Sequence, residues 1–159
     1  MTRPDDLEKS YQKMQKRYGL PDFSKLDFEF EINSRDTEEN TTYFLRYVRR
    51  RMNDRLAFFT RLIENILHPP SPSLASTYED RVLTDEDRQI LLEQFKRLMI
   101  LEREAFMLEA TLDEKGDAGY VKTVMKDWPR IKEQLIHVFR KIERAWQSEE
   151  TINLENYFG

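Results

Sequence analysis

The 159-residue chain has no cysteine, only four glycines and six prolines, and two histidines. Without cysteine there are no disulfides, thiolate zinc sites, iron–sulfur clusters or cysteine nucleophiles. Glycine and proline together are about half as frequent as is usual in globular proteins, which disfavours hairpin-rich folds and glycine-loop phosphate sites. Two histidines are too few for a multi-histidine metal site within one chain. We therefore expect no metal, no cofactor and no bound small molecule.

Charge and hydropathy narrow the class of protein further. Charged residues make up 35% of the chain, both signs are mixed, and the net charge is −4, so no overall basic field attracts nucleic acid. No apolar run approaches the ~18 residues of a membrane span, and the first six residues lack the apolar region of a secretory signal. Leu, Ile, Val and Phe form about 26% of the chain, enough for a packed core. We expect a cytoplasmic protein with a single helical domain.

The few helix-breaking residues are clustered, and the long segments between the clusters predict helices. Residues 22–68 and 73–115 contain neither glycine nor proline. The prediction is an all-α fold, an up-and-down bundle of three long helices with a shorter N-terminal helix and a docked aromatic arm. The expected segments are a helix at 5–18, an arm at 19–36, a helix at 37–67, a linker at 68–83, helices at 84–113 and 117–148, and a tail at 149–159.

The helix predicted at 117–148 has the most regular apolar spacing. Its apolar residues recur every three or four positions, as one buried face of a helix requires; they are Val121, Val124, Trp128, Ile131, Leu135, Val138, Ile142 and Ala145. Pro129 interrupts this pattern because it lacks an N–H group and its ring clashes with the preceding turn. We expect a kink there, or a new helix start with Asp127 as its cap.

The segment 26–32 is ambiguous. Its sequence, Leu-Asp-Phe-Glu-Phe-Glu-Ile, alternates strictly between apolar and polar residues, which is typical of a strand. Phe23, Leu26 and Phe30 also fit one face of a helix. A short helix and an extended arm both stay open, as does addition of this segment as a strand to a partner or a second copy.

A wider resemblance begins at Lys16-Arg17-Tyr18-Gly19-Leu20-Pro21-Asp22-Phe23 and continues through Leu26, Phe28 and Phe30. This stretch resembles the opening of small uncharacterised helical proteins from archaea, and the later Arg-rich helix and Trp128-Pro129 are compatible with it. The resemblance implies a cytoplasmic helical protein, and it brings no activity, cofactor or site residues.

Arginine is concentrated in residues 41–63, which contain six Arg and one acid. Arg46, Arg49 and Arg50 share one helix face and are candidates for contact with nucleic acid or a protein partner, because arginine binds phosphates bidentately. Segment 68–116, with 6 basic and 11 acidic residues, offers the alternative of pairing within the chain.

A second charged set lies beside the predicted apolar seams. Arg51 and Arg55, with Glu102 and Glu109, suggest a buried ion network between two helices, which would specify their register. An acid–base or metal site on the two glutamates is the alternative, although the Glu-x-x-His motifs of di-iron bundles are absent.

The remaining candidates are apolar. Candidate hydrophobic contacts with a partner are Phe28, Phe30, Trp128, Tyr157 and Phe158; for the tryptophan, core packing is the alternative. We expect His137 to be a partly buried structural histidine. With no catalytic motif found, the leading hypothesis is a non-enzymatic helical interaction protein, a homodimer or a subunit of an assembly. An RNA-binding accessory protein and an enzyme or metal site on core carboxylates are the alternatives.

Overall fold

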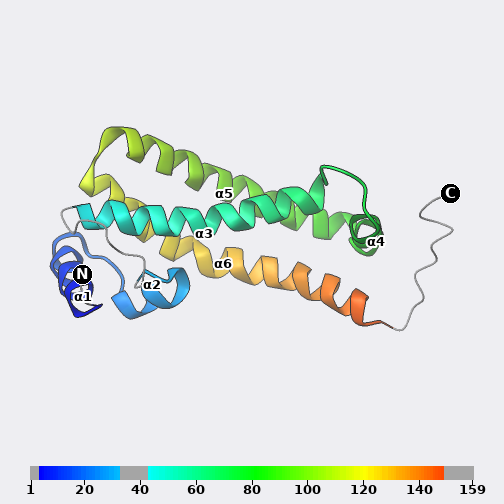
Figure 1. Cartoon of the computed structure of the whole chain (residues 1–159), viewed down its shortest axis with the longest axis horizontal. Coiled ribbons are helices and arrows are strands. Elements are labelled where there is room, and N and C mark those ends of the chain that lie inside the picture. The colour runs from blue at the N-terminus through cyan, green and yellow to red at the C-terminus, as the bar shows by residue number, and fades with distance from the viewer. Residues whose placement is uncertain (1–3, 33–42, 149–159) are drawn as a thin grey trace. The chain divides into compact units, whose positions relative to one another are not determined.

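The computed structural model describes residues 4–32 and 43–148, and the fold of this part of the chain is all-α, which confirms the predicted class (Figure 1). Its helices are α1 (Pro4–Tyr18), α2 (Phe23–Phe30), α3 (Phe44–Leu67), α4 (Leu74–Val82), α5 (Asp85–Thr111) and α6 (Glu114–Gln147). The first residues of the helix predicted at 37–67, and the whole predicted tail, lie outside the described residues.

The chain divides into two compact units. Unit 1 contains Met1–Phe58 and Met99–Trp128, and unit 2 contains Phe59–Leu98 and Pro129–Gly159. Helices α3, α5 and α6 therefore contribute residues to both units, whereas α1 and α2 belong to unit 1 and α4 to unit 2. Each unit has its own set of buried apolar side chains.

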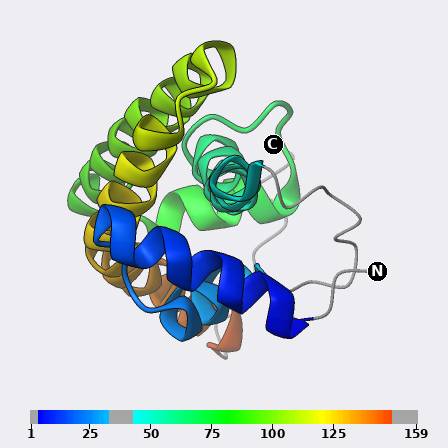
Figure 2. The same ribbon diagram turned by 90° about the vertical axis from the view of Figure 1, so that its left-hand side faces the viewer.

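In unit 1, α1 and α2 are joined by a tight turn and lie side by side (Figure 2). Gly19 ends α1 in the left-handed conformation, with φ of 66°, and its N–H donates to the carbonyl of Gln15. The buried Tyr11 holds the turn closed, because its hydroxyl donates to the Pro21 carbonyl at 2.5 Å and its ring lies 5.1 Å from that of Phe23.

Within the aromatic arm expected at 19–36, residues 23–30 form the short helix α2, and residues 33–36 lie outside the described residues. Phe23, Leu26 and Phe30 are buried on one face of it, while Phe28 points away and is 82% exposed. Helix α2 ends at Glu31, which has a φ of 51°. The extended-arm and strand interpretations are therefore wrong for residues 23–30. The alternating pattern misled because a helix sorts Phe28 and Phe30 onto different faces by a period of 3.6.

In unit 2, part of the predicted linker 68–83 is the helix α4. Ser73 and Ser76 form a reciprocal capping box at its start. Tyr78 on α4 donates to the carbonyl of Ala145 on α6 at 2.8 Å, and its ring lies 4.5 Å from that of Trp146. These contacts hold α4 against α6, and they explain why part of a proline- and serine-rich segment is helical.

The start of α5 is fixed by three hydrogen bonds of one residue, Asp87. Its carboxylate accepts from the Thr84 N–H at 3.0 Å and from the Lys141 ammonium on α6 at 2.7 Å, while its own N–H donates to the Thr84 hydroxyl at 3.1 Å. Burial would raise the pKa of Asp87, but the hydrogen bonds from Lys141 and Thr84 together outweigh burial and lower it. Thr84 is therefore the N-terminal cap of α5.

Helix α6 differs from the predicted helix in two respects, its first residue and its course at Pro129. It begins at Glu114 and not at the predicted residue 117, so Gly116 lies within its first turn and not between helices as expected. It continues through Pro129, so the predicted restart at Asp127 is wrong. The boundary between the two units falls at Trp128 and Pro129, where the helix also loses one backbone donor.

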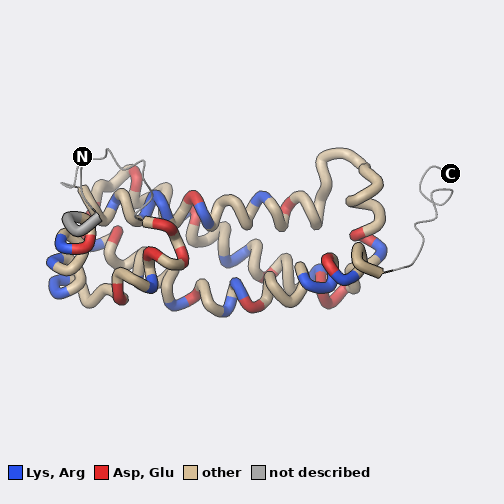
Figure 3. The backbone as a smooth tube through the Cα atoms, turned by 60° about the horizontal axis from the view of Figure 1, so that its bottom comes forward, with Lys and Arg blue, Asp and Glu red and all other residues tan. Residues whose placement is uncertain are grey.

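Both signs of charge are interspersed along the tube of each unit (Figure 3). Within the ranges 4–32 and 43–148, no helix combines the length and the apolar character that crossing a membrane requires.

Candidate functional site

The most prominent polar feature of unit 1 is an ion network centred on Arg49 of α3. The Arg49 side chain is only 2% exposed. Its Nε donates to Asp117 Oδ1 on α6 at 2.5 Å, and its Nη2 donates to Glu109 Oε2 on α5 at 2.7 Å. A third bond, at 3.3 Å, joins Nη1 to the carbonyl of Ala105 on α5. One guanidinium therefore ties α3 to both α5 and α6 inside unit 1.

Arg50 completes the network from the solvent side. Its Nη2 and Nε both donate to the Glu109 carboxylate, the latter at 3.1 Å, so that Glu109 is shared by two arginines. These hydrogen bonds, from Arg50 first and Arg49 second, lower the pKa of Glu109 to about 2. Asp117 behaves differently: burial raises its pKa, and the bond from Arg49 offsets this only in part.

The network differs in membership from the one expected from the sequence. Glu109 is a member, but Arg51 donates to the carbonyl of Glu31 at 3.2 Å, and Glu102 accepts from its neighbour Arg103 at 3.4 Å. Arg55 is half-buried on α3. Sequence reasoning missed Asp117, although an acid among the small residues Gly116, Ala118 and Gly119 was a usable sign of close helix packing.

The predicted cationic face of Arg46, Arg49 and Arg50 is not a single exposed surface. Arg49 is buried, and the half-exposed Arg50 binds Glu109. The Arg46 guanidinium lies over the Tyr43 ring, 4.6 Å from its centroid. Position 49 lies on the same side of α3 as the buried Val48 and Met52. The Arg49 side chain therefore points toward the acids of α5 and α6.

Two of the predicted hydrophobic contact residues belong to the core. Phe30 and Trp128 are buried, their ring centroids lie 5.9 Å apart, and the Trp128 indole N–H donates to Glu29 at 2.8 Å. Phe28 is exposed, while Tyr157 and Phe158 lie outside the described residues. His137 is also exposed, which corrects the expectation of a partly buried histidine.

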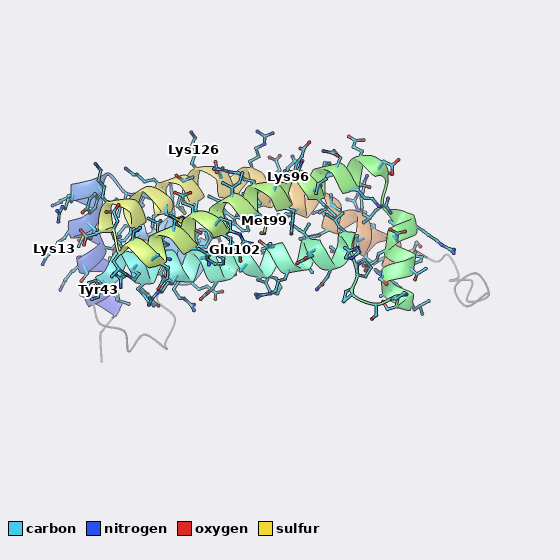
Figure 4. All side chains as sticks on the ribbon, turned by 90° about the horizontal axis from the view of Figure 1, so that it is seen from above. Lys13, Tyr43, Lys96, Met99, Glu102 and Lys126 are labelled. Carbon is cyan, nitrogen blue, oxygen red and sulfur yellow. The ribbon has the colours of Figure 1, made fainter. Side chains whose placement is uncertain are left out.

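An exposed apolar surface that the sequence did not predict lies on α5, in the part of it that belongs to unit 1. Ile100, Phe106 and Met107 are 56%, 52% and 66% exposed. The Arg103 guanidinium lies among them, 5.0 Å from the centroid of the Phe106 ring. Leu101 and Ala105 point the opposite way and are buried. We call Ile100, Arg103, Phe106 and Met107 the α5 outer face; Figure 4 looks onto this helix, with Met99 and Glu102 labelled one turn apart.

Two concave regions among the described residues of unit 2 are large enough to consider as sites. One, of about 440 Å³, follows α6 and is largely basic; its lining residues are Pro129, Lys132, Glu133, Ile136, His137, Arg140, Lys141 and Arg144. The other, of about 280 Å³, is apolar and lies between α3, α4 and α6; its lining residues are Leu62, Ile66, Glu79, Phe139, Ile142 and Glu143. Neither lining includes a Ser, Thr or Cys that would serve as a nucleophile.

The carboxylates of Asp80, Asp87, Glu109 and Asp117 each pair with an arginine or a lysine. Among residues 4–32 and 43–148, no cluster of three or more His, Asp or Glu residues is suited to hold a metal ion. The shared Glu109 is occupied by two guanidinium groups, which compete with any cation. The geometry therefore favours a structural role for this network.

Comparisons of the chain with protein-family models, with curated proteins and with solved structures gave no match. The resemblance to helical proteins of archaea consequently stays a prediction, and the function has to be argued from the surface and interior of this chain.

The low pKa of Glu109 gives a testable dependence of stability on pH. A carboxylate whose pKa is lower in the folded state contributes stability above its unfolded pKa, near 4.5, and loses that contribution as the pH falls toward about 2. Because the side chain is 45% exposed, solvent screening reduces the contribution to about 1 kcal/mol. Glu109→Gln should therefore be about 1 kcal/mol less stable than wild type at pH 7, with the difference closing near pH 2.

Urea unfolding followed by circular dichroism at several pH values would measure this. Glu93→Gln is the matched control and should run parallel to wild type, because Glu93 is an exposed glutamate of the same helix whose carboxylate accepts a long 3.4 Å bond from the uncharged Gln89. Asp117 contributes with the opposite sign and is present in all three proteins. A constant difference between Glu109→Gln and wild type from pH 7 to pH 2 would contradict the assigned pairing.

Proposed function

We propose that this protein is a non-enzymatic helical interaction protein that self-associates through the α5 outer face. The observation that carries the proposal is the exposure of three large apolar side chains, Ile100, Phe106 and Met107, on one side of a helix whose other side is already buried. Apolar side chains clustered on an exposed helix face are typical of a surface that a second protein covers.

The interior of unit 1 supports the same proposal. The hydrogen bonds of the buried Arg49 fix α3 against α5 and α6. Helix α5 is therefore held firmly, and its outer side faces solvent. A surface on a rigid helix loses little conformational entropy when it binds, so even a modest apolar area contributes to affinity.

The two alternatives from the sequence receive less support. Binding of RNA through Arg46, Arg49 and Arg50 would need side chains that reach phosphates, and Arg49 is buried against Asp117. A carboxylate site at Glu102 and Glu109 would need free oxygens, and the Glu109 carboxylate accepts from two arginines.

Light scattering after size-exclusion chromatography tests the proposal. We expect the wild-type chain to approach the mass of a dimer as its concentration rises toward about 200 µM. Such a high concentration is needed because three exposed apolar side chains form a small interface, and small interfaces give weak dimers. Met107→Glu places a charge on the α5 outer face and should keep the protein monomeric.

Ile136→Glu is the matched control, because Ile136 is an exposed aliphatic residue in the middle of another helix, α6. It should associate as wild type does. A wild-type chain that stays monomeric over the whole concentration range would overturn the proposal, and so would equal effects of the two substitutions.

A further inference from the structure

We infer that the apolar cavity between α3, α4 and α6 in unit 2 is a docking site for residues 149–159 of the same chain. Leu154 is the side chain that enters the cavity, and Ile152 packs against Trp146 beside it. The juxtaposition that carries the inference is an apolar cavity walled in part by α6, with the last turn of α6 next to it and an apolar segment that follows directly in the sequence. The inference concerns unit 2 and is independent of association through the α5 outer face.

The cavity has room for about two apolar side chains. Its volume is about 280 Å³, and a cavity of ~150 Å³ accommodates a benzene ring. Four of its lining residues are apolar and two are glutamates: Leu62, Ile66, Phe139, Ile142, Glu79 and Glu143. Ile142 is buried, whereas the other three apolar residues are half-buried. An apolar side chain that fills the cavity removes the remaining apolar surface of these residues from water, which is favourable.

The end of α6 leads from the cavity to the start of the segment. Phe139, Ile142 and Glu143 precede Trp146 by seven, four and three residues, so all four lie on one face of the helix. Trp146 is 39% exposed, and its indole N–H donates at 2.9 Å to Glu79, which also lines the cavity. A segment that returns along this face of α6 therefore meets Trp146 first and the cavity next.

The length of the segment matches this path. Residues 149–159 follow Ser148 and lie outside the described residues. The cavity-lining residues of α6 precede Ser148 by five to nine positions, which is about 8–14 Å back along the helix axis. If residues 149–151 reverse the chain direction, Ile152 comes to lie beside the last turn of α6. Leu154 then lies about 7 Å further back and reaches the level of the cavity.

Alternation along an extended chain selects which side chains dock. Side chains two positions apart point to the same side, so Ile152 and Leu154 face α6 together. Asn153 and Glu155 then face solvent, as their polarity requires. The next apolar pair of the segment lies about 16 Å or more beyond Ile152, which carries it past the cavity.

The acids of the cavity are compatible with this arrangement. Glu79 accepts from Trp146, and Glu143 accepts from Gln147 at 3.2 Å; both hydrogen bonds are exposed. Glu155 points away from these carboxylates when Leu154 points inward. The apolar part of the cavity is therefore open to Leu154 without bringing a third carboxylate into it.

Covalent attachment favours this segment over a separate partner. A segment joined to its site by a few residues is present at an effective concentration of about millimolar. A free peptide or the same segment of a second copy would have to approach that concentration to compete. The cavity also offers no cation that would attract an outside acidic ligand, because its two charged residues are both glutamates.

Disulfide trapping tests the docking directly, because the chain contains no cysteine of its own. Full-length Glu143→Cys/Leu154→Cys should form an intramolecular disulfide under mild oxidation at least about fivefold faster than Arg144→Cys/Leu154→Cys. Position 143 lines the cavity, whereas position 144 is one residue nearer in the chain but lies about 100° around α6, on its basic outer side. Basic surroundings favour the thiolate at position 144, so reactivity alone would give the opposite order.

Tryptophan fluorescence provides a second test without cysteine. Leu154→Asp should release the segment, shift the emission of Trp146 to longer wavelength and increase its quenching by acrylamide. Asn153→Asp is the matched control, because it adds the same charge one position earlier and should leave both signals as in wild type. Trp128 is buried in unit 1 and contributes the same background in all three proteins.

The outcomes are decisive and separate from those for the α5 outer face. Faster linking at position 143 together with greater exposure of Trp146 in Leu154→Asp would support the docking. Equal linking at positions 143 and 144, or equal emission and quenching of the two aspartate variants, would overturn it. Linking at position 143 that is mainly between two molecules would assign the cavity to a second copy and overturn docking within one chain. A monomeric wild type would overturn the proposed function alone.

Discussion

Replacing Arg49 with methionine should lower the free energy of unfolding by about 3–5 kcal/mol, the largest effect we expect from a single polar substitution. Asp117 is 4% exposed and depends on Arg49 for its charged hydrogen bond. Methionine fills much of the same volume but leaves the carboxylate buried without its cation. Burial already raises the pKa of Asp117, and the raised pKa would rise further in the variant.

Chemical unfolding at pH 7 would measure the loss, and two companion variants define its cause. Arg49→Met/Asp117→Leu removes both charges and should recover most of the stability, because replacing a whole buried ion pair by apolar residues is often neutral. Arg88→Met breaks the more exposed pair with Asp80 in unit 2 and should cost about 1 kcal/mol or less. A double variant as unstable as Arg49→Met would mean that the loss comes from packing and not from the unpaired charge.

Replacing Trp128 with alanine should cost a similar 3–5 kcal/mol, through loss of packing. Trp128 is buried at the end of unit 1's part of α6, where its ring packs against Phe30 and its N–H donates to Glu29. Alanine would remove most of the side chain that holds α2 on α6, so the cavity would reach both helices. Leaving Glu29 without this donor adds to the cost.

The second tryptophan is a natural control for the first. Trp146 is half-exposed, contacts Tyr78 and donates to Glu79, so Trp146→Ala should cost about 1 kcal/mol. Thermal unfolding of the two variants, followed by circular dichroism, compares them under one set of conditions. Equal losses would show that Trp128 is less important to the core of unit 1 than its burial indicates.

Apolar spacing located the helices and most of their buried faces because burial in a helix recurs with a fixed period. In α6, the predicted seam from Val121 to Ile142 is buried at each of its positions. In α3, Phe44, Val48 and Met52 recur every four positions, and all three are buried. The same logic gave no decision at 26–32, where an alternating pattern and a helical pattern coincide. In the structure, contacts of Phe23 with Tyr11 and of Phe30 with Trp128 accompany a helix over 23–30.

The charged residues could not be assigned in the same way. At the edge of the apolar seam, a shift of one position in the sequence moves a side chain from the buried face to the exposed face. Arg49, which is buried, and Arg50, which is half-exposed, differ by one such position. Which of them turns inward depends on where Asp117 and Glu109 lie, and those acids are distant in sequence. The α5 outer face was hidden for a related reason: α5 carries apolar residues on several sides, and their spacing did not show which of them other helices would leave uncovered.

Composition and periodicity by themselves determined that the protein is helical, without cysteine chemistry, and where its long helices run, because these depend on local backbone preference and on one repeating distance. The tertiary structure alone decided that Arg49, Asp117 and Glu109 form one network and that Ile100 and Met107 face solvent. Those outcomes depend on which helix lies opposite each side chain. The spacing of residues within one helix does not show which other helix, distant in sequence, will pack against it.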